Sequence, residues 1–330
     1  MKMRNRTYLS ILLLICVSSL TFAQTRTAGR HPYSSEAPLN EPTVFNPGII
    51  SAGDYESHPA FTPDGRTLYF LKNSPDFSFW TIVVSHFRNG RWSKPEVAPF
   101  SGRYSDADPF ITADGSKLYF ISNRPLDQKG EAKGDLDIWV MEKTNDGWGP
   151  PKNMGPVINS DGNEWYPTLS ANGTLYFGSD RANGKGRTDI YRAPLKNGNY
   201  EAAENLGAEI NTQFNEFEPL IANDESFLIF MAGGRADGLG GFDLYISHNR
   251  NGAWTKPVNL GNKVNSTGNE LSPTISPDGK YFFWTSTRSL SFKSMKEPMT
   301  YADLERKLRS PQNGLGDIYQ IDLKALKLEP

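Results

Sequence analysis

One segment recurs five times along the chain and constrains the fold more than any other feature. Each copy has a proline, a short extended run, a turn such as Pro277-Asp278-Gly279 and an aromatic strand such as Tyr281-Phe282-Phe283. In such a turn proline presets its own φ and glycine accepts a positive φ. The prolines lie 50, 58, 52 and 54 residues apart: Pro59, Pro109, Pro167, Pro219 and Pro273. Repeats of about 50 residues built from short strands are typical of β-propellers.

Two more strands are expected in each repeat. The third strand opens with an aspartate in four of the five repeats: Asp137, Asp189, Asp243 and Asp317. An Asn-Gly or Asp-Gly turn suited to a tight hairpin follows in repeats one to four. Four strands in each of five repeats predict an all-β fold, a five-bladed β-propeller with four antiparallel strands per blade. The last repeat lacks a fourth strand, and the segment beginning at Thr43 resembles one. We therefore predict that the N-terminal strand closes the last blade and hides both sheet edges.

The N-terminus has the pattern of a secretion signal. Lys2, Arg4 and Arg6 precede an apolar run that is too short to span a bilayer, and small residues end at Ala23. We expect cleavage after Ala23, a periplasmic or secreted location, and no transmembrane segment in the mature chain. A lipoprotein modified at Cys16 is the alternative. It is disfavoured because the residue before Cys16 is isoleucine, where a lipoprotein signal has a small residue.

Charge and cysteine content exclude several functions. The chain of 330 residues has 35 basic and 37 acidic side chains. Removing residues 1–23 leaves 32 basic and 37 acidic side chains, a net charge of −5. That balance argues against a nucleic-acid partner, which favours a basic surface. Cys16 is the only cysteine, so the mature chain has no disulfide, cysteine nucleophile or thiolate metal site.

The predicted domain organisation has four parts. Residues 1–23 form the signal, residues 24–42 a flexible tether, residues 43–323 the propeller and residues 324–330 a C-terminal tail. An insertion at about residues 289–315 interrupts the last repeat. Within it, Thr300 and Asp303 fit a capping box, and Tyr301, Leu304 and Leu308 share one helical face. We expect a short helix from about 301 to 309 that packs against the rim of the propeller.

These repeats resemble the PD40, or TolB-like WD40-related, propeller family. The family motif, Pro-x-x-Ser-Pro-Asp-Gly, an aromatic strand, Ser-x-Arg and then Asp-Ile-Tyr, is matched closely by residues 273–288 together with Asp317-Ile318-Tyr319. The first blade departs most, with Leu71-Lys72-Asn73 where the arginine belongs. The resemblance covers residues 43 to 323 and implies an envelope protein of Gram-negative bacteria. Some relatives bind partner proteins. Propellers host both enzymes and scaffolds, so the resemblance is specific for fold and weak for function.

Two further sets of charged residues recur by blade. A carboxylate stands three residues before each proline: Glu56, Asp106, Glu164, Glu216 and Glu270. An arginine follows the aromatic strand in four blades: Arg124, Arg181, Arg235 and Arg288. We expect the carboxylates to ring one mouth of the channel, which would then receive a cation, a basic peptide or a sugar. The alternative is structural: each arginine binds the carboxylates of its own or the next blade. Repetition in nearly every blade favours this alternative.

The residues between each carboxylate and its proline differ from blade to blade. They are Ser57-His58, Ala107-Asp108, Trp165-Tyr166, Phe217-Glu218 and Leu271-Ser272. Trp165, Tyr166 and Phe217 are candidates for an aromatic platform that binds a sugar ring or a partner side chain, with packing between blades as the favoured alternative. His58 with Asp108 and Glu218 could ligate a metal. The chain has four histidines and no two at ligand spacing, so we predict no metal and no cofactor.

The sequence lacks the usual catalytic signatures. It has no Gly-x-Ser-x-Gly, no His-Glu-x-x-His and no glycine-rich phosphate loop, so we assign no catalytic residue. Our main hypothesis is an exported, non-catalytic propeller that binds an envelope protein or glycan through the acidic mouth. The alternative is a carbohydrate-active enzyme, a polysaccharide lyase or glycoside hydrolase, with its site at the same mouth.

Overall fold

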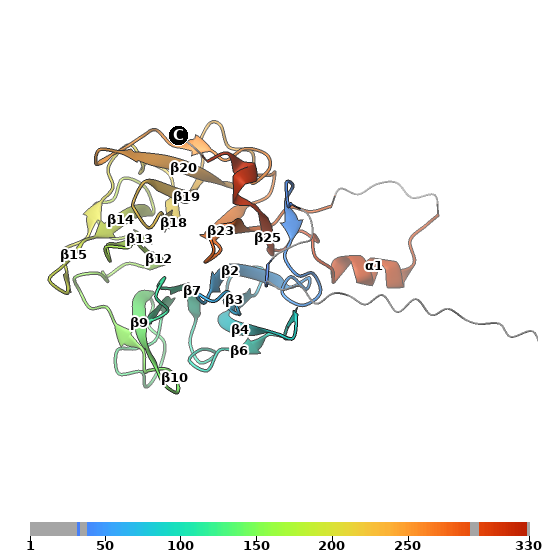
Figure 1. The fold of residues 1–330 in the computed structure, drawn as a ribbon, viewed down its shortest axis with the longest axis horizontal. Coiled ribbons are helices and arrows are strands. Elements are labelled where there is room, and N and C mark those ends of the chain that lie inside the picture. Colours follow the sequence, from blue (N-terminus) through green and yellow to red (C-terminus); the bar gives the residue numbers. More distant parts are fainter. Residues whose placement is uncertain (1–31, 34–37, 291–296, 329–330) are drawn as a thin grey trace, which may run out of the picture.

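The chain forms a ring of five β-sheets around a central axis (Figure 1). This computed structural model describes residues 32–33, 38–290 and 297–328, so the predicted signal and its cleavage site lie outside the described residues. Each innermost strand contacts the innermost strand of the next blade, and contact between β23 and β2 closes the ring. The predicted all-β, five-bladed propeller is confirmed.

Each blade has three longer strands and a short outer one. Blade 1 has β2 (Tyr55–Phe61), β3 (Thr67–Asn73), β4 (Trp80–Arg88) and β6 (Glu96–Val97). Blade 2 has β7 (Asp106–Ile111), β8 (Lys117–Ser122), β9 (Asp137–Thr144) and β11 (Lys152–Asn153). Blade 3 has β12 (Glu164–Leu169), β13 (Leu175–Ser179), β14 (Asp189–Ala193) and β17 (Glu204–Asn205). Blade 4 has β18 (Glu216–Ile221), β19 (Phe227–Gly233), β20 (Phe242–Arg250) and β22 (Val258–Asn259).

Small hairpins extend the outer ends of blades 1 to 4. Their strands are β5 (Arg91–Trp92), β10 (Gly147–Trp148), β15 (Leu195–Lys196), β16 (Asn199–Tyr200) and β21 (Ala253–Trp254). The hairpins of blades 1, 3 and 4 turn at Asn-Gly pairs, as the sequence predicts. The hairpin of blade 2 turns at Asn145-Asp146 instead, and the predicted turn residue Gly147 is the first residue of β10.

The N-terminal strand completes blade 5. That blade has β23 (Glu270–Ile275), β24 (Tyr281–Ser286) and β25 (Asp317–Asp322), and β1 (Thr43–Val44) pairs antiparallel with β25. The next residue, Phe45, is buried and packs edge-on against the rings of Phe61, Trp92 and Phe283. The predicted closure is confirmed, and it joins the first blade to the last.

The aromatic strand motif forms the core between blades. The phenylalanine in the middle or at the end of each motif strand is fully buried: Phe70, Phe120, Phe177, Phe230 and Phe282. Each contributes roughly 1.5–3 kcal/mol through the apolar surface that it removes from water. This burial explains why the motif recurs with so little change.

All five innermost strands carry a β-bulge at the residue before the proline. The strand register shifts there in every blade. The bulged residues have left-handed backbones with φ between 48° and 56°: His58, Asp108, Tyr166, Glu218 and Ser272. A non-glycine residue rarely adopts this conformation. Its presence at the equivalent position of every blade makes it a property of the repeat.

Part of the predicted tether packs on the propeller. Tyr33 is buried against the rings of Phe61, Tyr281 and Phe283. The indole N–H of Trp92 donates to the carbonyl of Pro32 at 3.0 Å. These two residues therefore belong to the folded core at the junction of blades 1 and 5 and do not form a flexible tether.

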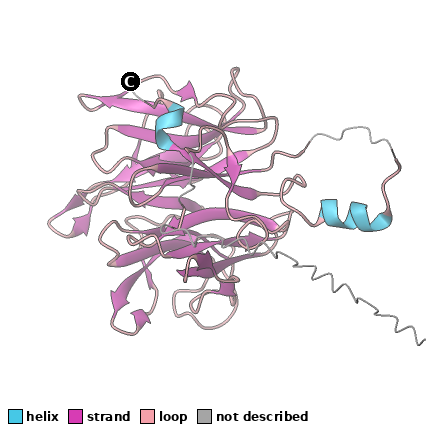
Figure 2. Ribbon diagram, turned by 45° about the vertical axis from the view of Figure 1, so that its right-hand side comes forward, coloured by secondary structure: helices cyan, strands magenta, loops and turns pink. Residues whose placement is uncertain are grey.

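The predicted helix exists, but its predicted packing is wrong. Helix α1 (Tyr301–Leu308) begins with the expected capping box between Thr300 and Asp303. No residue of α1 is buried, and the helix stands away from the ring (Figures 1 and 2). It is held at its C-terminal end, where the side-chain amide of Asn313 donates to the carbonyls of Leu308 and Gly53, both at 2.9 Å. An amphipathic pattern identifies an apolar face and does not say what covers it.

Close approach at the base of α1 requires a glycine. A Cβ on Gly53 would lie 2.5 Å from the carbonyl carbon of Arg309, and the φ of Gly53 is +96°. A 3₁₀ turn, η1 (Leu323–Leu326), follows β25. Among the described residues, no helix has the length and apolar character needed to cross a bilayer.

Candidate functional site

The five recurring carboxylates are fully buried and do not form an open anionic mouth. Glu164 is representative. Its Oε1 accepts hydrogen bonds from the hydroxyls of Ser160 (2.6 Å) and Ser179 (2.9 Å) and from Arg181 (3.2 Å), and its Oε2 accepts one from the backbone N–H of Ser160. Burial raises the pKa of Glu164, and these hydrogen bonds oppose the rise. Carboxylates bound in this way hold the loop between blades to the inner strand.

The four recurring arginines bind within their own blades. Arg124 lies 2.7 Å from Asp106, and Arg181 and Arg235 each lie 3.2 Å from their glutamates. Arg288 is 3.7 Å from Glu270. Each guanidinium also donates to a carbonyl of the preceding inter-blade loop and lies over at least two aromatic rings. These are the contacts that a structural role requires.

In blade 1 the counter-ion is Lys72, which lies opposite Glu56 at the register position that Ser122 has opposite Asp106 in blade 2. Its ammonium contacts both Glu56 and Asp54. Burial raises the pKa of Glu56 to about 7, although the neighbouring Lys72 lowers it. Asp317 of blade 5 also lies close enough to raise the pKa of Glu56, and its own pKa is raised by burial to about 6.

The third-strand aspartates shape the loops that precede them. Asp189 accepts from the backbone N–H groups of Lys185 (2.6 Å) and Gly186 (2.9 Å). Asp243 and Asp317 accept backbone N–H groups of their own loops, and Asp137 binds the side chain of Lys133 at 2.5 Å. All four are buried, so they fix the loops rather than contact solvent.

A further repeated position escaped the sequence analysis. Asn159 accepts from the backbone N–H of Ile138 at 2.8 Å and donates to its carbonyl at 3.1 Å, so its side chain pairs with the third strand as a fourth strand would. The equivalent residues all lie five positions before a recurring carboxylate: Ser51, Ser101, Asn159, Asn211 and Asn265. That constant spacing from the carboxylate could have identified the position in the sequence.

The bulged residues meet across the ring in a cluster that we call the axial cluster: His58, Asp108, Tyr166, Glu218 and Ser272. Nε2 of His58 lies 3.0 Å from Oδ1 of Asp108 and 3.2 Å from Oε1 of Glu218. The hydroxyl of Tyr166, from blade 3, donates to the carbonyl of Pro273 in blade 5 at 2.7 Å. No member is more than 6% exposed. The cluster therefore closes the channel.

Every carboxylate oxygen of the axial cluster is engaged. The backbone N–H of Tyr166 donates to Oδ2 of Asp108 at 2.8 Å, and the backbone N–H of Ser272 donates to Oε2 of Glu218. Burial lowers the pKa of His58, but the two carboxylates outweigh it and raise the pKa to about 10. His58 is therefore an imidazolium at neutral pH. The three residues that we considered as metal ligands do come together, but as an ion-paired group. Among the described residues, no cluster of His, Cys, Asp or Glu side chains is arranged to hold a metal ion.

The predicted aromatic platform does not form as a unit of three. Tyr166 is buried in the axial cluster, while Trp165 and Phe217 are only partly buried. Trp165 lies 5.9 Å from the ring of Trp80, which continues through Phe77 to Tyr55 at centroid distances of 6.4 and 5.0 Å. Phe77 and Trp80 come from blade 1, where the third-strand aspartate is missing, and the sequence analysis did not single them out.

Large apolar side chains are exposed on the loops between second and third strands. The strands are antiparallel, so all these loops lie at one end of the ring, which we call the loop face. Phe79 is 60% and Leu290 70% exposed there, and Tyr301 of α1 is 75% exposed. The full set comprises Phe77, Phe79, Leu126, Leu239, Leu290, Tyr301, Leu304 and Leu308.

The fold and site define a five-bladed β-propeller with a closed polar axis and an apolar loop face. No family model and no curated protein matches the sequence. Among solved structures, TolB from Acinetobacter baumannii is 16% identical with a TM-score of 0.45 over 81% of this chain and 54% of TolB. The chain thus spans about half the length of that protein.

Two α-L-arabinofuranosidases are similar to the same degree. The α-L-arabinofuranosidase PaAbf62A from Podospora anserina is 14% identical with a TM-score of 0.46, over 87% of this chain and 94% of that one. The catalytic domain of the Coprinopsis cinerea GH62 α-L-arabinofuranosidase is also 14% identical, with a TM-score of 0.44 over 88% and 96%. At these identities the similarity concerns the fold alone.

Proposed function

We propose that the protein is an exported, non-catalytic propeller that binds a partner protein through its loop face. One observation carries the proposal: α1 is anchored at its base and presents Tyr301, Leu304 and Leu308 to solvent without covering any of them. Soluble proteins rarely leave such a group of large apolar side chains exposed unless a partner covers it. Phe77, Phe79 and Leu290 are further exposed apolar side chains, on the loops of blades 1 and 5.

The chemistry of this surface favours a protein over a glycan. Tyr301, Leu304 and Leu308 stand at helical positions i, i+3 and i+7, the spacing with which an amphipathic helix enters an apolar groove. Leucine side chains offer no hydrogen bonds to sugar hydroxyls. A partner with an apolar groove, located in the envelope or outside the cell, fits these observations best.

Catalysis at the axis is the competing proposal. Asp108 and Glu218 both lie against His58, and a pair of carboxylates is what glycoside hydrolysis uses. Their four oxygens are all engaged within the protein, which leaves none to protonate a leaving group. Turnover of a polysaccharide by the purified protein, lost on changing Glu164, Glu216 or the axial pair, would favour the enzyme.

Affinity capture from envelope extract with matched variants tests the binding proposal. Leu304→Ser/Leu308→Ser removes the apolar face of α1, and Glu305→Ser/Arg306→Ser is the control on its charged face. We expect the proteins retained by the wild type to be lost with the first variant and kept with the second. Equal recovery with both variants, at unchanged thermal stability, would contradict this site.

A further inference from the structure

Blade 1 has a pocket of about 350 Å³ beside the loop face. Its walls come from the loop before β2, from β3 and β4, and from the segment that leads into β6. Because Tyr55 pairs with Asn73 at the end of β3, the loop before β2 lies at the loop-face end of the blade. The lining includes five apolar side chains: Ile49, Ala52, Val83, Pro95 and Val97.

In blades 2 to 5 an arginine fills the equivalent place. Arg181 is representative: its guanidinium lies 4.8 Å from the ring centre of Tyr191 and donates to the loop before the innermost strand at 2.6 Å. Blade 1 has no arginine between β3 and β4. Its third strand has Val83 at the position of the aromatic ring, since Val83 pairs with Phe70 as Tyr191 pairs with Phe177. The pocket therefore lies where two large side chains of the other blades are missing.

The outer strand of blade 1 departs from the repeat at the same place. Val97 pairs with Val83, and the residue at this register position in blades 2 and 3 is an asparagine that binds the third-strand aspartate: Asn153 and Asn205. Blade 1 lacks that aspartate, and Val97 is 56% exposed. One blade has thus lost its arginine, its aromatic ring and its asparagine together. Because structural residues recur by blade in this ring, such a combined exception indicates a binding surface.

The pocket offers few polar groups that could orient a small molecule. The ammonium of Lys72 is already bound by Glu56 and Asp54, and the side chains of Lys94 and Glu96 are exposed. Sites for small molecules usually combine apolar walls with a few polar groups that converge on the ligand. An apolar side chain of a protein needs no such groups, so it suits this pocket better.

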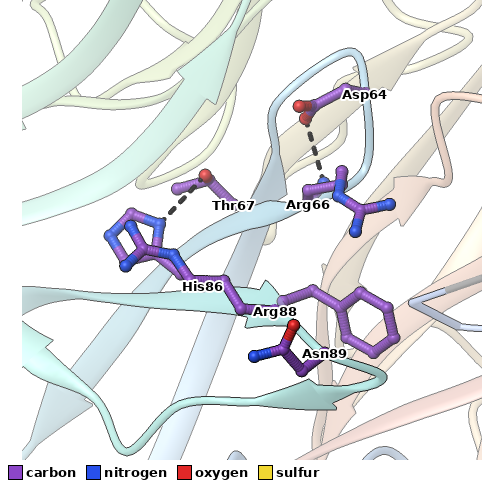
Figure 3. Close-up of a pocket in the computed structure, with 7 residues that line it drawn as sticks. Asp64, Arg66, Thr67, His86, Arg88 and Asn89 are labelled. Atoms are coloured by element: carbon purple, nitrogen blue, oxygen red, sulfur yellow. Dashed lines mark hydrogen bonds between the residues drawn. The ribbon is translucent and has the colours of Figure 1, made fainter. Parts of the chain in front are cut away.

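The other hollow of blade 1 lies at the opposite end of the blade and has polar walls (Figure 3). Nδ1 of His86 lies 3.1 Å from the hydroxyl of Thr67, and the backbone N–H of Arg66 donates to Asp64 at 3.0 Å. An apolar group placed there would take these polar groups out of water without giving them a new partner. Only the pocket beside the loop face therefore suits an apolar occupant.

This pocket adjoins the base of α1. The lining residue Ala52 precedes Gly53, whose carbonyl accepts a hydrogen bond from the side chain of Asn313. The same amide group of Asn313 donates to the carbonyl of Leu308 at the end of α1. The loop that forms one wall of the pocket is therefore the loop that holds the helix, and the pocket is continuous with the proposed partner surface.

We propose that an aromatic side chain of the partner inserts into this pocket when the partner covers α1. The proposal rests on the proposed function and adds the pocket to its binding surface. The inserted ring takes the place that the arginine and the third-strand aromatic residue fill in the other blades. Tryptophan and tyrosine are among the side chains that contribute most to protein interfaces, where they fill pockets and exclude water.

Titration of the purified protein with indole, the ring system of tryptophan, tests the pocket without the partner. We expect saturable shifts of the methyl NMR signals of Val83 and Val97, and none with glycerol. Val83→Tyr gives blade 1 the aromatic ring of the other blades and should abolish the shift of Val97. Leu304→Ser/Leu308→Ser should leave the shifts unchanged, because α1 does not line the pocket. Absence of saturable shifts at millimolar indole would overturn the proposal.

Affinity capture from envelope extract tests whether the partner uses the pocket. Val83→Tyr should lower the recovery of the α1-dependent proteins at least tenfold and Val97→Asn about fivefold, because each removes apolar surface from the pocket. Val258→Asn is the matched control, since Val258 is 61% exposed on the outer strand of blade 4, and its recovery should equal that of the wild type. Because Val97 is exposed, Val97→Asn decides the test if Val83→Tyr lowers the melting temperature.

The same capture separates the two proposals. Loss of the proteins with Leu304→Ser/Leu308→Ser, but full recovery with Val83→Tyr and Val97→Asn, would overturn the pocket and leave the α1 surface intact. Full recovery with all of these variants would contradict the proposed function as well.

Discussion

His58 holds the axis of the propeller together through charge. It comes from blade 1 and contacts Asp108 of blade 2 and Glu218 of blade 4, so one side chain links three blades. Its ring nitrogen Nδ1 lies 2.8 Å from the hydroxyl of Ser57, which orients the imidazole. Removing it would leave two buried carboxylates without a counter-ion.

His58→Ala should therefore be strongly destabilising. Removing one partner of a buried ion-paired group lowers the free energy of unfolding by about 3–5 kcal/mol. His248→Ala, at the less buried end of blade 4, is the control and should stay within about 0.5 kcal/mol of the wild type. Urea unfolding measures both. A loss for His58→Ala no larger than that for His248→Ala would show that the axial contacts do not stabilise the ring.

The charge on His58 also predicts a pH dependence. Its pKa is raised in the folded protein from 6.5 to about 10, so the folded state holds this proton where the unfolded chain has lost it. The resulting stabilisation is complete below pH 6.5 and declines as the pH rises to about 10. His58→Gln should lack this component of the decline, as measured by urea unfolding across the range. An NMR titration in which the His58 ring loses its proton near pH 6.5 would contradict the assignment.

The sequence located the axial residues but not their arrangement. All five positions could be identified from the sequence, because the residues between carboxylate and proline differ from blade to blade while the flanking motif recurs. The left-handed bulge turns His58 inward and leaves Trp165 at the mouth. Residue type does not reveal this bulge, since histidine, aspartate, tyrosine, glutamate and serine all adopt it here. The open acidic mouth was wrong for a related reason: spacing predicts which end of a strand a carboxylate occupies, and does not predict its burial.

Among the elements, the N-terminal strand adds buried contacts to the ring, and α1 adds none. Strand β1 brings Phe45 into a buried aromatic group, whereas α1 buries nothing. Both were predictable as elements, from the missing fourth strand and from the capping box. The packing of α1 was not predictable, because an amphipathic pattern identifies an apolar face without identifying what covers it.

Phe45→Ala should open the junction of blades 1 and 5. Truncation of a fully buried phenylalanine costs about 3–5 kcal/mol, because it removes apolar contacts and leaves a cavity. Val97→Ala, on an exposed strand of blade 1, should change the unfolding free energy by no more than about 0.5 kcal/mol. Urea unfolding of the two variants compares them directly, and a similar small loss in both would mean that β1 does not secure the closure.

Replacing residues 300–308 with a glycine-serine segment of equal length should leave the melting temperature of the propeller unchanged. No side chain of α1 is buried, so the ring loses no core contact. Circular dichroism and calorimetry measure the helix signal and the melting temperature respectively. A clear fall in melting temperature would indicate that the helix packs on the ring in solution.

The whole molecule is a ring, and the side chains in its interior have structural roles. Buried carboxylates, arginines and the axial ion pairs occupy the positions that recur or converge, and they leave the channel closed. The apolar loop face, with α1, lies at one end of the ring. The repeat pattern predicts the ring, since five strand sets must close on each other. It does not predict the surface at either end of the ring, because the residues that differ between blades lie in the loops and turns there.

Site-specific photocrosslinking tests the partner-binding claim most directly. A photoreactive amino acid is placed at Leu304 or Phe79 on the loop face, and at Asn251, in an exposed hairpin at the opposite end of blade 4, as the control. We predict a discrete adduct from the two loop-face positions in cells that make the protein, and none from Asn251. The same adduct from all three positions, or none from Leu304 and Phe79, would contradict a partner-binding loop face.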